Sequence, residues 1–516
     1  MGEPFIAFYR KHVKKSWKIA FFSALIFGLI AHAYKFTNTL PNHDALFHVY
    51  SNQNVISSGR WFLTVACGLS GYFDLPWLIG LLSLLWIGLT AVVIADLFEI
   101  EDPVVLVLEG GLLAAFPCVT NTFFFEFAAD GYMLSMLLAA LAVRLTRMGE
   151  GRTGLSVLAG LCLCLSCGIY QAYVSFALLL SLCCFIWELL RDRFSGGVFR
   201  RWIGKQLLVY SGGMLAYWII WKLCLRLEQA SASAYQGIDR LGHISPASLL
   251  DSLRETGRVL LRFFLGGNIF EYGLSGYAVM NLLFLLLSLL ALLFAAHSSG
   301  LAKKPGRLLL MLLSLALIPV AACIWRFLSP EVSYHMLMLQ SLSVWYLFTL
   351  FLCARYCSAQ LRTAAAILFA VLVFRFSLQA NASYFKMEKS IERSRADAIE
   401  MLTRIHMADD GSVKKIAFLG GGDQSLVAAG DPEIRELLVN AHQLRSTLLF
   451  DNTYASLYLR TILKADYLAV EGEELDRLAA DEAVKDMDVW PGQDSLRIVG
   501  DTAVIRLPDP PPESNP

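Results

Sequence analysis

Charged residues are scarce in this sequence. They make up only 17% of the 516 residues, against 56% hydrophobic residues, and the mean hydropathy is +0.55. This composition excludes a soluble globular protein. Apolar stretches recur at a length near the roughly 20 residues that a helix needs to cross hydrocarbon, so we predict a polytopic membrane protein. None of them shows the alternation of a barrel strand, so helices are the expected spanning form.

Cysteine is missing from the hydrophilic C-terminal region. All eleven cysteines lie in or beside apolar stretches, which argues against a disulfide framework or a zinc site. Cys164 and Cys167 have the CxxC spacing but lie inside an apolar stretch, where packing between helices explains them better. No cofactor is expected, and a divalent metal is not expected either.

The sequence also lacks a cleavable signal peptide and an internal repeat of fixed period. The basic segment from Arg10 to Lys18 precedes an apolar stretch without a small-residue cleavage site, so we expect an uncleaved first span and a cytoplasmic N-terminus. The net charge is zero, and no nucleic acid is expected as a partner. We predict eleven spans, near residues 17–34, 75–97, 103–117, 127–146, 153–169, 172–190, 206–227, 275–296, 307–326, 333–353 and 361–380.

The distribution of arginine and lysine sets the expected topology. Four basic connections fall on the side of the N-terminus, and positive loops are usually cytoplasmic. They contain Arg144, Arg147 and Arg152; Arg191, Arg193, Arg200, Arg201 and Lys205; Lys303, Lys304 and Arg307; and Arg355 and Arg362. We therefore expect a multi-pass protein of the inner (plasma) membrane whose C-terminal region is extracytoplasmic.

Three parts are predicted along the chain: a transmembrane domain over 1–380 with outer loops 35–74 and 228–274, an extracytoplasmic α/β domain over 381–507, and a disordered tail over 508–516. Residues 246–264 have the pattern of an amphipathic helix that lies in the membrane interface. The C-terminal domain is expected to start with a helix over 384–405 and to contain strands over 414–419, 466–470 and 496–507. The expected fold is mainly α.

Asp44 is the leading candidate for chemistry. It lies in the first outer loop with His43, His48 and Arg60, and this polar segment offers more hydrogen-bonding groups than a connection needs. A carboxylate there can act as the general base for an attacking hydroxyl. The alternative is a loop carboxylate that caps a short helix next to the membrane.

Two further outer segments offer polar groups at the ends of apolar spans. Glu126 and Asp130 are four residues apart and would share one side of a helix. They fit a substrate site, or a structural pairing with arginines of neighbouring helices. Tyr170 and Gln171 stand where one span ends and the next begins, and can line a polar cavity, whereas Tyr173 fits the aromatic belt.

A substrate that carries phosphate would require cations on the same face. Arg326 and His335 flank a short outer turn, and Arg258 belongs to a series with Arg254 and Arg262 on the amphipathic helix. The arginine fork suits phosphate oxygens. The alternative for the series is contact with lipid headgroups.

Four segments together resemble the GtrII family of membrane glucosyltransferases, the serotype-converting type, within the class of polyprenyl-phosphate-sugar-dependent transferases with the GT-C fold. They are HDALFH followed by SGRW at 58–61, FPCVTNTFFFEFAADGY at 116–132, GIYQAY at 168–173 and NASY at 381–384. The resemblance covers roughly residues 15 to 405.

The resemblance implies a polyprenyl phosphate donor, such as undecaprenyl phosphate glucose, in the outer leaflet. It implies transfer of the hexose, with inversion, to a surface polysaccharide such as O-antigen, with Asp44 as the base. Family members often have two acidic residues where this chain has His43 and Asp44, so metal dependence stays open. We expect a metal-independent site in which arginine neutralises the leaving phosphate.

Two other classes of function were weighed against the transferase. A flippase or transporter of lipid-linked sugars should place polar groups at mid-membrane depth, often in repeated halves, whereas here they gather at the outer ends of spans. Transfer of phosphoethanolamine or an acyl group would need a nucleophilic Ser or Thr with a metal or base cluster, which the C-terminal region does not offer.

Overall fold

The computed structural model describes residues 13–48, 51–148, 152–191, 196–242, 245–266, 275–422, 435–438, 441 and 444–509. The chain divides into two units. The membrane unit comprises Met1–Asn38 and Tyr50–Asn381, and the C-terminal unit comprises Thr39–Val49 and Ala382–Pro516. The segment Thr39–Val49, expected as part of an outer loop of the transmembrane domain, is therefore assigned to the C-terminal unit.

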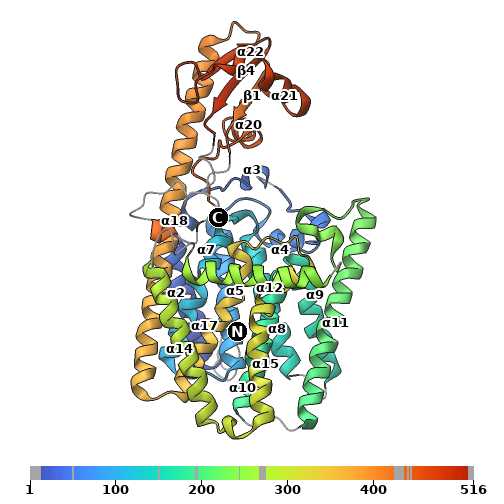
Figure 1. Cartoon of the computed structure of the whole chain (residues 1–516), viewed down its shortest axis with the longest axis vertical. Helices are drawn as coiled ribbons and strands as arrows, with labels where there is room; N and C mark the ends of the chain where they lie inside the picture. The colour runs from blue at the N-terminus through green and yellow to red at the C-terminus, as the bar shows by residue number, and fades with distance from the viewer. Residues whose placement is uncertain are drawn as a thin grey trace, which may run out of the picture. The chain divides into compact units, whose positions relative to one another are not determined.

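Long helices and a few short ones build the membrane unit (Figure 1). They are α2 (Lys15–Thr37), α5 (Pro76–Leu97), α6 (Pro103–Ala115), α7 (Pro117–Phe124), α8 (Ala129–Met148), α9 (Thr153–Ile169), α10 (Tyr173–Leu190), α11 (Gly196–Leu227), α12 (Pro246–Leu265), α14 (Gly276–Ser298), α15 (Pro305–Ala322), α16 (Ile324–Leu328), α17 (Leu342–Tyr356) and the first part of α18 (Ala359–Ala408). Ten helical stretches among the described residues are long and apolar enough to cross a membrane. A shorter apolar helix, Thr153–Ile169, lies at the fifth predicted span along the chain, 153–169. A mainly α, multi-pass membrane protein is therefore confirmed.

Proline and small residues position these helices. Pro76, Pro103 and Pro117 stand in the first turns of α5, α6 and α7, where the missing N–H removes no hydrogen bond. Gly110 on α6 lets α2 approach closely, because a Cβ there would lie 2.6 Å from the backbone nitrogen of Ala24. Small residues at helix contacts are the usual means of close packing in membranes.

Helix α12 runs across the other helices of the membrane unit (Figure 1). The sequence predicted this helix over 246–264, and the structure confirms it. Ser252, Thr256, Val259 and Phe263 are buried against the bundle. Leu250 and Leu253 are exposed on one flank, and Arg258 is exposed on the other. This division into packed, apolar and charged sides is typical of a helix in the membrane interface.

A four-stranded sheet forms the centre of the C-terminal unit. The strands are β1 (Lys415–Gly420), β2 (Leu468–Ala469), β3 (Leu496–Val499) and β4 (Thr502–Leu507). Their order is β2-β1-β4-β3, with β1 parallel to both β2 and β4, and β3 antiparallel to β4. All three predicted strand regions contain strands, and the last is a β3–β4 hairpin.

Helices cover both faces of this sheet. Ile416 and Phe418 of β1 pack in a core with residues of α18 and α20 (Asn452–Thr461). The alternating Ala417 and Leu419 pack on the other face, beside α21 (Gly472–Ala480) and α22 (Glu482–Lys485). This alternation is the period of two expected of a strand buried on both faces. The predicted tail lies outside the described residues from position 510 on.

Candidate active site

A tight turn in the membrane unit presents Arg60. The turn follows η1 (Ile56–Ser58) and is closed by a bridge between Val55 and Arg60. Gly59 has φ +80°, and a Cβ there would lie 2.4 Å from the Tyr217 hydroxyl and 2.5 Å from the Gln171 side-chain nitrogen. Only glycine adopts this conformation so close to neighbours without strain.

Tyrosine rings surround the guanidinium of Arg60. Its Nη1 donates a hydrogen bond of 3.0 Å to the Tyr132 hydroxyl, and the group lies 4.7 Å from the centre of the Tyr170 ring. These two rings stack with centroids 4.5 Å apart. Burial lowers the pKa of Arg60, but the nearby tyrosine hydroxyls, Tyr132 foremost, raise it more, so the net shift is upward and the group stays charged.

This guanidinium has unused hydrogen-bonding capacity. Its Nε is buried and makes no hydrogen bond, and no Asp or Glu in the described part of the chain forms an ion pair with Arg60. A partly buried arginine usually has a carboxylate partner. Arg60 is therefore suited to receive an anion with planar or tetrahedral oxygens, such as a phosphate.

Gln171 contributes to the architecture of this turn. Its Nε2 donates to the backbone oxygen of Ser58 (2.6 Å) and to the Tyr217 hydroxyl (3.2 Å). Its own backbone oxygen accepts from Nε1 of Trp325 (2.7 Å). These contacts occupy Gln171 in holding the loops together, while the adjacent Tyr170 faces Arg60.

A buried charge cluster lies at the end of α2. Lys35 and Glu126 form an ion pair in which the two side chains are only 1% and 9% exposed. The second carboxylate oxygen of Glu126 makes no hydrogen bond with any of the described residues. The sequence offered two explanations for Glu126, and the structure pairs it with a lysine rather than an arginine. Lys35 was missed, although a lysine directly after the first predicted span, 17–34, was visible in the sequence.

Asp74 is the second residue that sequence reasoning missed. It is partly buried just before α5. Burial and the nearby Glu126 carboxylate raise its pKa to about 6, and Lys35 opposes this shift. The folded protein therefore binds this proton more tightly than the unfolded chain does. The stability that the protonated form contributes is present below about pH 4 and is lost as the pH rises through about 6.

Replacing Asp74 by Asn should stabilise the protein at neutral pH. We expect a gain of about 1–2 kcal/mol at pH 7.5, allowing for screening of a partly exposed group, and little difference at pH 4. Thermal unfolding of both proteins in detergent at the two pH values measures this. A variant that is less stable than the wild type at pH 7.5 would contradict the assignment.

Asp130 is buried near the start of α8 and only 1% exposed. Its Oδ1 accepts from the backbone nitrogen of Gly131 at 2.9 Å, and its Oδ2 makes no hydrogen bond within the described residues. Glu126 lies in the 3-10 turn η3 (Glu126–Ala128), which continues directly into α8, so Glu126 and Asp130 belong to one helical stretch, Glu126–Met148. Phe125, with φ −98° and ψ 58°, ends α7 before that turn.

The other predicted cations have partners of their own. Arg326 on α16 forms a 2.7 Å ion pair with Asp251 of α12 and donates to the backbone oxygen of Val332 (3.0 Å). Arg258 is 72% exposed and pairs with Glu255. His335 lies 3.4 Å from the side-chain nitrogen of Gln236. Arg326 thus ties two helices together, which makes Arg60 the better candidate for an anion.

Asp44 lies in the C-terminal unit, directly before the short helix α3 (Ala45–His48). The cap of this helix is Asn42, whose side-chain oxygen accepts from the backbone nitrogen of Ala45 at 2.9 Å. The Asp44 carboxylate is 40% exposed, and its Oδ1 lies 3.5 Å from Nε2 of His43. His48 lies at the other end of α3. Asp44 is thus accessible to a substrate. The alternative role considered for Asp44, capping of this helix, is performed by Asn42.

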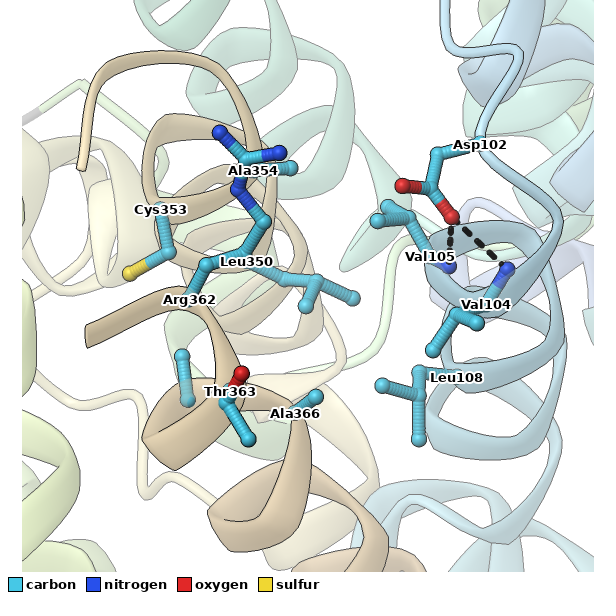
Figure 2. A pocket seen from close by; sticks show the side chains of 11 residues that line it. Asp102, Val104, Val105, Leu108, Leu350, Cys353, Ala354, Arg362, Thr363 and Ala366 are labelled. Atoms are coloured by element: carbon cyan, nitrogen blue, oxygen red, sulfur yellow. Dashed lines mark hydrogen bonds between the residues drawn. The ribbon is translucent and has the colours of Figure 1, made fainter. Parts of the chain in front are cut away.

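A pocket of about 210 Å³ lies elsewhere in the membrane unit, between α6, α17 and α18. Figure 2 shows Asp102 and Arg362 on opposite sides of it, with the Asp102 carboxylate accepting from the backbone nitrogens of Val104 and Val105. None of the predicted site residues lines this pocket. No cluster of three or more metal-binding side chains occurs within the described ranges, and the roles predicted for the site residues stay predictions.

The fold and these polar clusters define a multi-pass membrane protein with a buried cationic site and an accessible carboxylate. A family model described as "Glucosyl transferase GtrII" matches residues 33–328. The match spans more than half of the chain, so the chain belongs to this family and is a glycosyltransferase of the glucosyltransferase kind. The matched range, 33–328, contains every predicted site residue except His335. Comparisons with curated proteins and with solved structures found no match.

Proposed function

We propose that the protein moves glucose from a polyprenyl phosphate donor to a surface polysaccharide, such as O-antigen, on the outer face of the inner (plasma) membrane. The family supplies the glucosyl transfer. The observation that supports a phosphate-bearing donor is Arg60, a charged guanidinium whose buried Nε makes no hydrogen bond within the part of the chain that the structure describes. A lipid-linked donor also fits a protein embedded in the bilayer.

The proposed reaction is a single displacement of the GT-C type. A hydroxyl oxygen of the acceptor attacks the anomeric carbon of glucose from the side opposite the lipid phosphate. The bond from that carbon to the phosphate oxygen breaks, and the lipid phosphate leaves with the electron pair. Attack from the opposite side inverts the anomeric configuration.

Two residues carry the charges of this reaction. Asp44 accepts the proton of the attacking hydroxyl as general base. Arg60 stabilises the negative charge that develops on the departing phosphate, as preorganised donors do at oxyanions. The reaction as written requires no metal ion.

The charges of the chain support the proposal that the reaction takes place on the outer face of the inner membrane. Four basic connections fall on the side of the N-terminus, which predicts a cytoplasmic N-terminus. An odd number of crossings then gives an extracytoplasmic C-terminal unit. The segment with Asp44 is part of that unit, so the base would act outside the cytoplasm.

Replacing Arg60 by Gln should weaken use of the donor. We expect the KM for polyprenyl phosphate glucose to rise about tenfold to a hundredfold, because a hydrogen bond to a charged group contributes about 1.5–3 kcal/mol. The donor KM of Arg60→Lys should lie between those of the wild type and Arg60→Gln, since lysine keeps the charge but lacks the forked guanidinium. The measurement is glucose transfer by protein reconstituted in vesicles at varied donor concentration.

A matched control is Arg477→Gln, because Arg477 is 79% exposed and pairs with Glu473 one helical turn away. This variant should keep the donor KM of the wild type. An unchanged donor KM in Arg60→Gln would contradict the phosphate role. Movement of the donor between leaflets without any glycosidic product would favour the transporter instead.

A further inference from the structure

The C-terminal unit holds the segment that carries Asp44. Leu46 of α3 is 2% exposed and belongs to the same core as Ile416, Tyr458 and Leu459. Burial of Leu46 fixes the orientation of α3 within this unit. Asp44, two residues before Leu46, and Phe47, directly after it, remain accessible, at 40% of the side chain and 51% of the residue.

Aromatic rings gather beside Asp44. The ring of Tyr454 lies 5.4 Å from that of Phe47, 5.5 Å from that of His43 and 4.4 Å from that of Phe450. Tyr454 is therefore the centre of the group. We call His43, Phe47, Phe450 and Tyr454 the aromatic platform.

Contacts within the C-terminal unit hold two rings of the aromatic platform, Phe450 and Tyr454, in place. Phe450 is only 7% exposed, and the guanidinium of Arg445 lies 5.8 Å from its ring centre. Tyr454 stands in the first turn of α20, whose N-cap Asp451 accepts from the Tyr454 backbone nitrogen at 2.9 Å. The ring of Tyr454, which packs against Phe450, thus supports the half-exposed ring of Phe47.

A half-exposed phenylalanine next to an exposed carboxylate matches the chemistry of a sugar. A pyranose has faces of C–H groups, which pack on the electron-rich face of an aromatic ring, and a rim of hydroxyls, which donate to carboxylates. Sites for small polar ligands commonly combine aromatic walls with a few placed polar groups. His43, 3.5 Å from Asp44, joins the platform to that carboxylate.

We propose that the aromatic platform and Asp44 form the subsite for one hexose ring of the acceptor glycan. The ring stacks on Phe47 and Tyr454 and presents a hydroxyl to the Asp44 carboxylate. The proposal rests on the proposed function for the identity of the acceptor. The subsite would give the C-terminal unit a direct part in acceptor recognition.

The test uses the full-length protein in lipid nanodiscs and two readouts. The first is binding of polysaccharide released by mild acid from the envelope of the producing cells, followed by saturation-transfer NMR. The second is the KM for that acceptor and for the lipid-linked donor in the transfer assay. The variants are Phe47→Leu and Tyr454→Leu, which keep an apolar side chain but remove the ring.

Each variant should weaken acceptor binding and raise the acceptor KM about threefold to tenfold, in line with typical aromatic contacts, with the donor KM unchanged. Tyr454→Phe keeps the ring and should keep most of the affinity. Phe385→Leu is the matched control, because Phe385 is also 51% exposed and lies in the same unit.

Three results would overturn the subsite: no polysaccharide binding by the wild type, wild-type affinity in both leucine variants, or an equal loss in Phe385→Leu. The binding readout does not require turnover. Polysaccharide binding that depends on the platform without any transfer would thus refute the proposed reaction while supporting the subsite.

Discussion

Replacing Asp44 by Asn should lower glucose transfer by about 10²–10⁴-fold, the contribution typical of a general base. The amide cannot accept the proton of the attacking hydroxyl, although it keeps the size and polarity of the side chain. The assay is incorporation of labelled glucose into polysaccharide by reconstituted protein. The binding of donor and acceptor should change much less than the rate.

Folding of this variant is checked by its melting temperature, which should match that of the wild type because the carboxylate is 40% exposed and does not cap α3. Asp44→Glu serves as a second comparison, since it retains a base at a shifted position. Wild-type activity in Asp44→Asn would place the base elsewhere, with Glu126 and Asp130 as the next candidates.

Replacing Lys35 by Met should destabilise the protein by about 3–5 kcal/mol. The change leaves the Glu126 carboxylate without its cation at a site where both side chains are at least nine-tenths buried, and an uncompensated buried charge is costly. Denaturant unfolding in mixed micelles measures the free energy of unfolding of both proteins.

The double variant Lys35→Met/Glu126→Gln tests whether the lost stability comes from the unpaired charge of Glu126. It removes both charges, so it should recover a large part of the lost stability. A single variant as stable as the wild type would show that the ion pair contributes little. A double variant no better than the single one would place the loss in packing of the lysine stem.

The transmembrane helices were predictable because their determinants are local. In lipid each span must satisfy its own backbone hydrogen bonds, so apolar length alone indicates a helix. The course of the chain past residue 381 was less predictable. Composition changes there, and the chain passes from the membrane unit to the C-terminal unit after Asn381. The predicted span 361–380 and the predicted helix 384–405 are nevertheless one helix, α18, from Ala359 to Ala408, and no proline or glycine interrupts the residues after 381.

The candidate site was predictable only as a set of residue types. Arg60 was identified from the polar segment of the first outer loop and Glu126 from its place at the end of a span, but their partners depend on tertiary packing. Glu126 meets Lys35 over a long separation in sequence, and Tyr170 reaches Arg60 from the loop between α9 and α10. The raised pKa of Asp74 follows from its burial and from the Glu126 charge beside it, and no local pattern reveals either.

The assignment of Thr39–Val49 to the C-terminal unit had no local signal either. The polar pattern around Asp44 indicated a functional loop, but the burial of Leu46 among residues of β1 and α20 is a long-range contact. For Arg326, a local pattern suggested a role that its long-range contact does not support. Its place beside a span suggested a phosphate ligand, whereas the structure pairs it with Asp251.

The most direct test of the account compares two donors with the reconstituted wild-type protein. Labelled glucose is supplied either as polyprenyl phosphate glucose or as a nucleoside diphosphate glucose, together with envelope polysaccharide as acceptor. The account predicts labelled polysaccharide of inverted anomeric configuration from the lipid-linked donor and none from the nucleotide donor. Transfer from the nucleotide sugar, or a retained configuration, would contradict it.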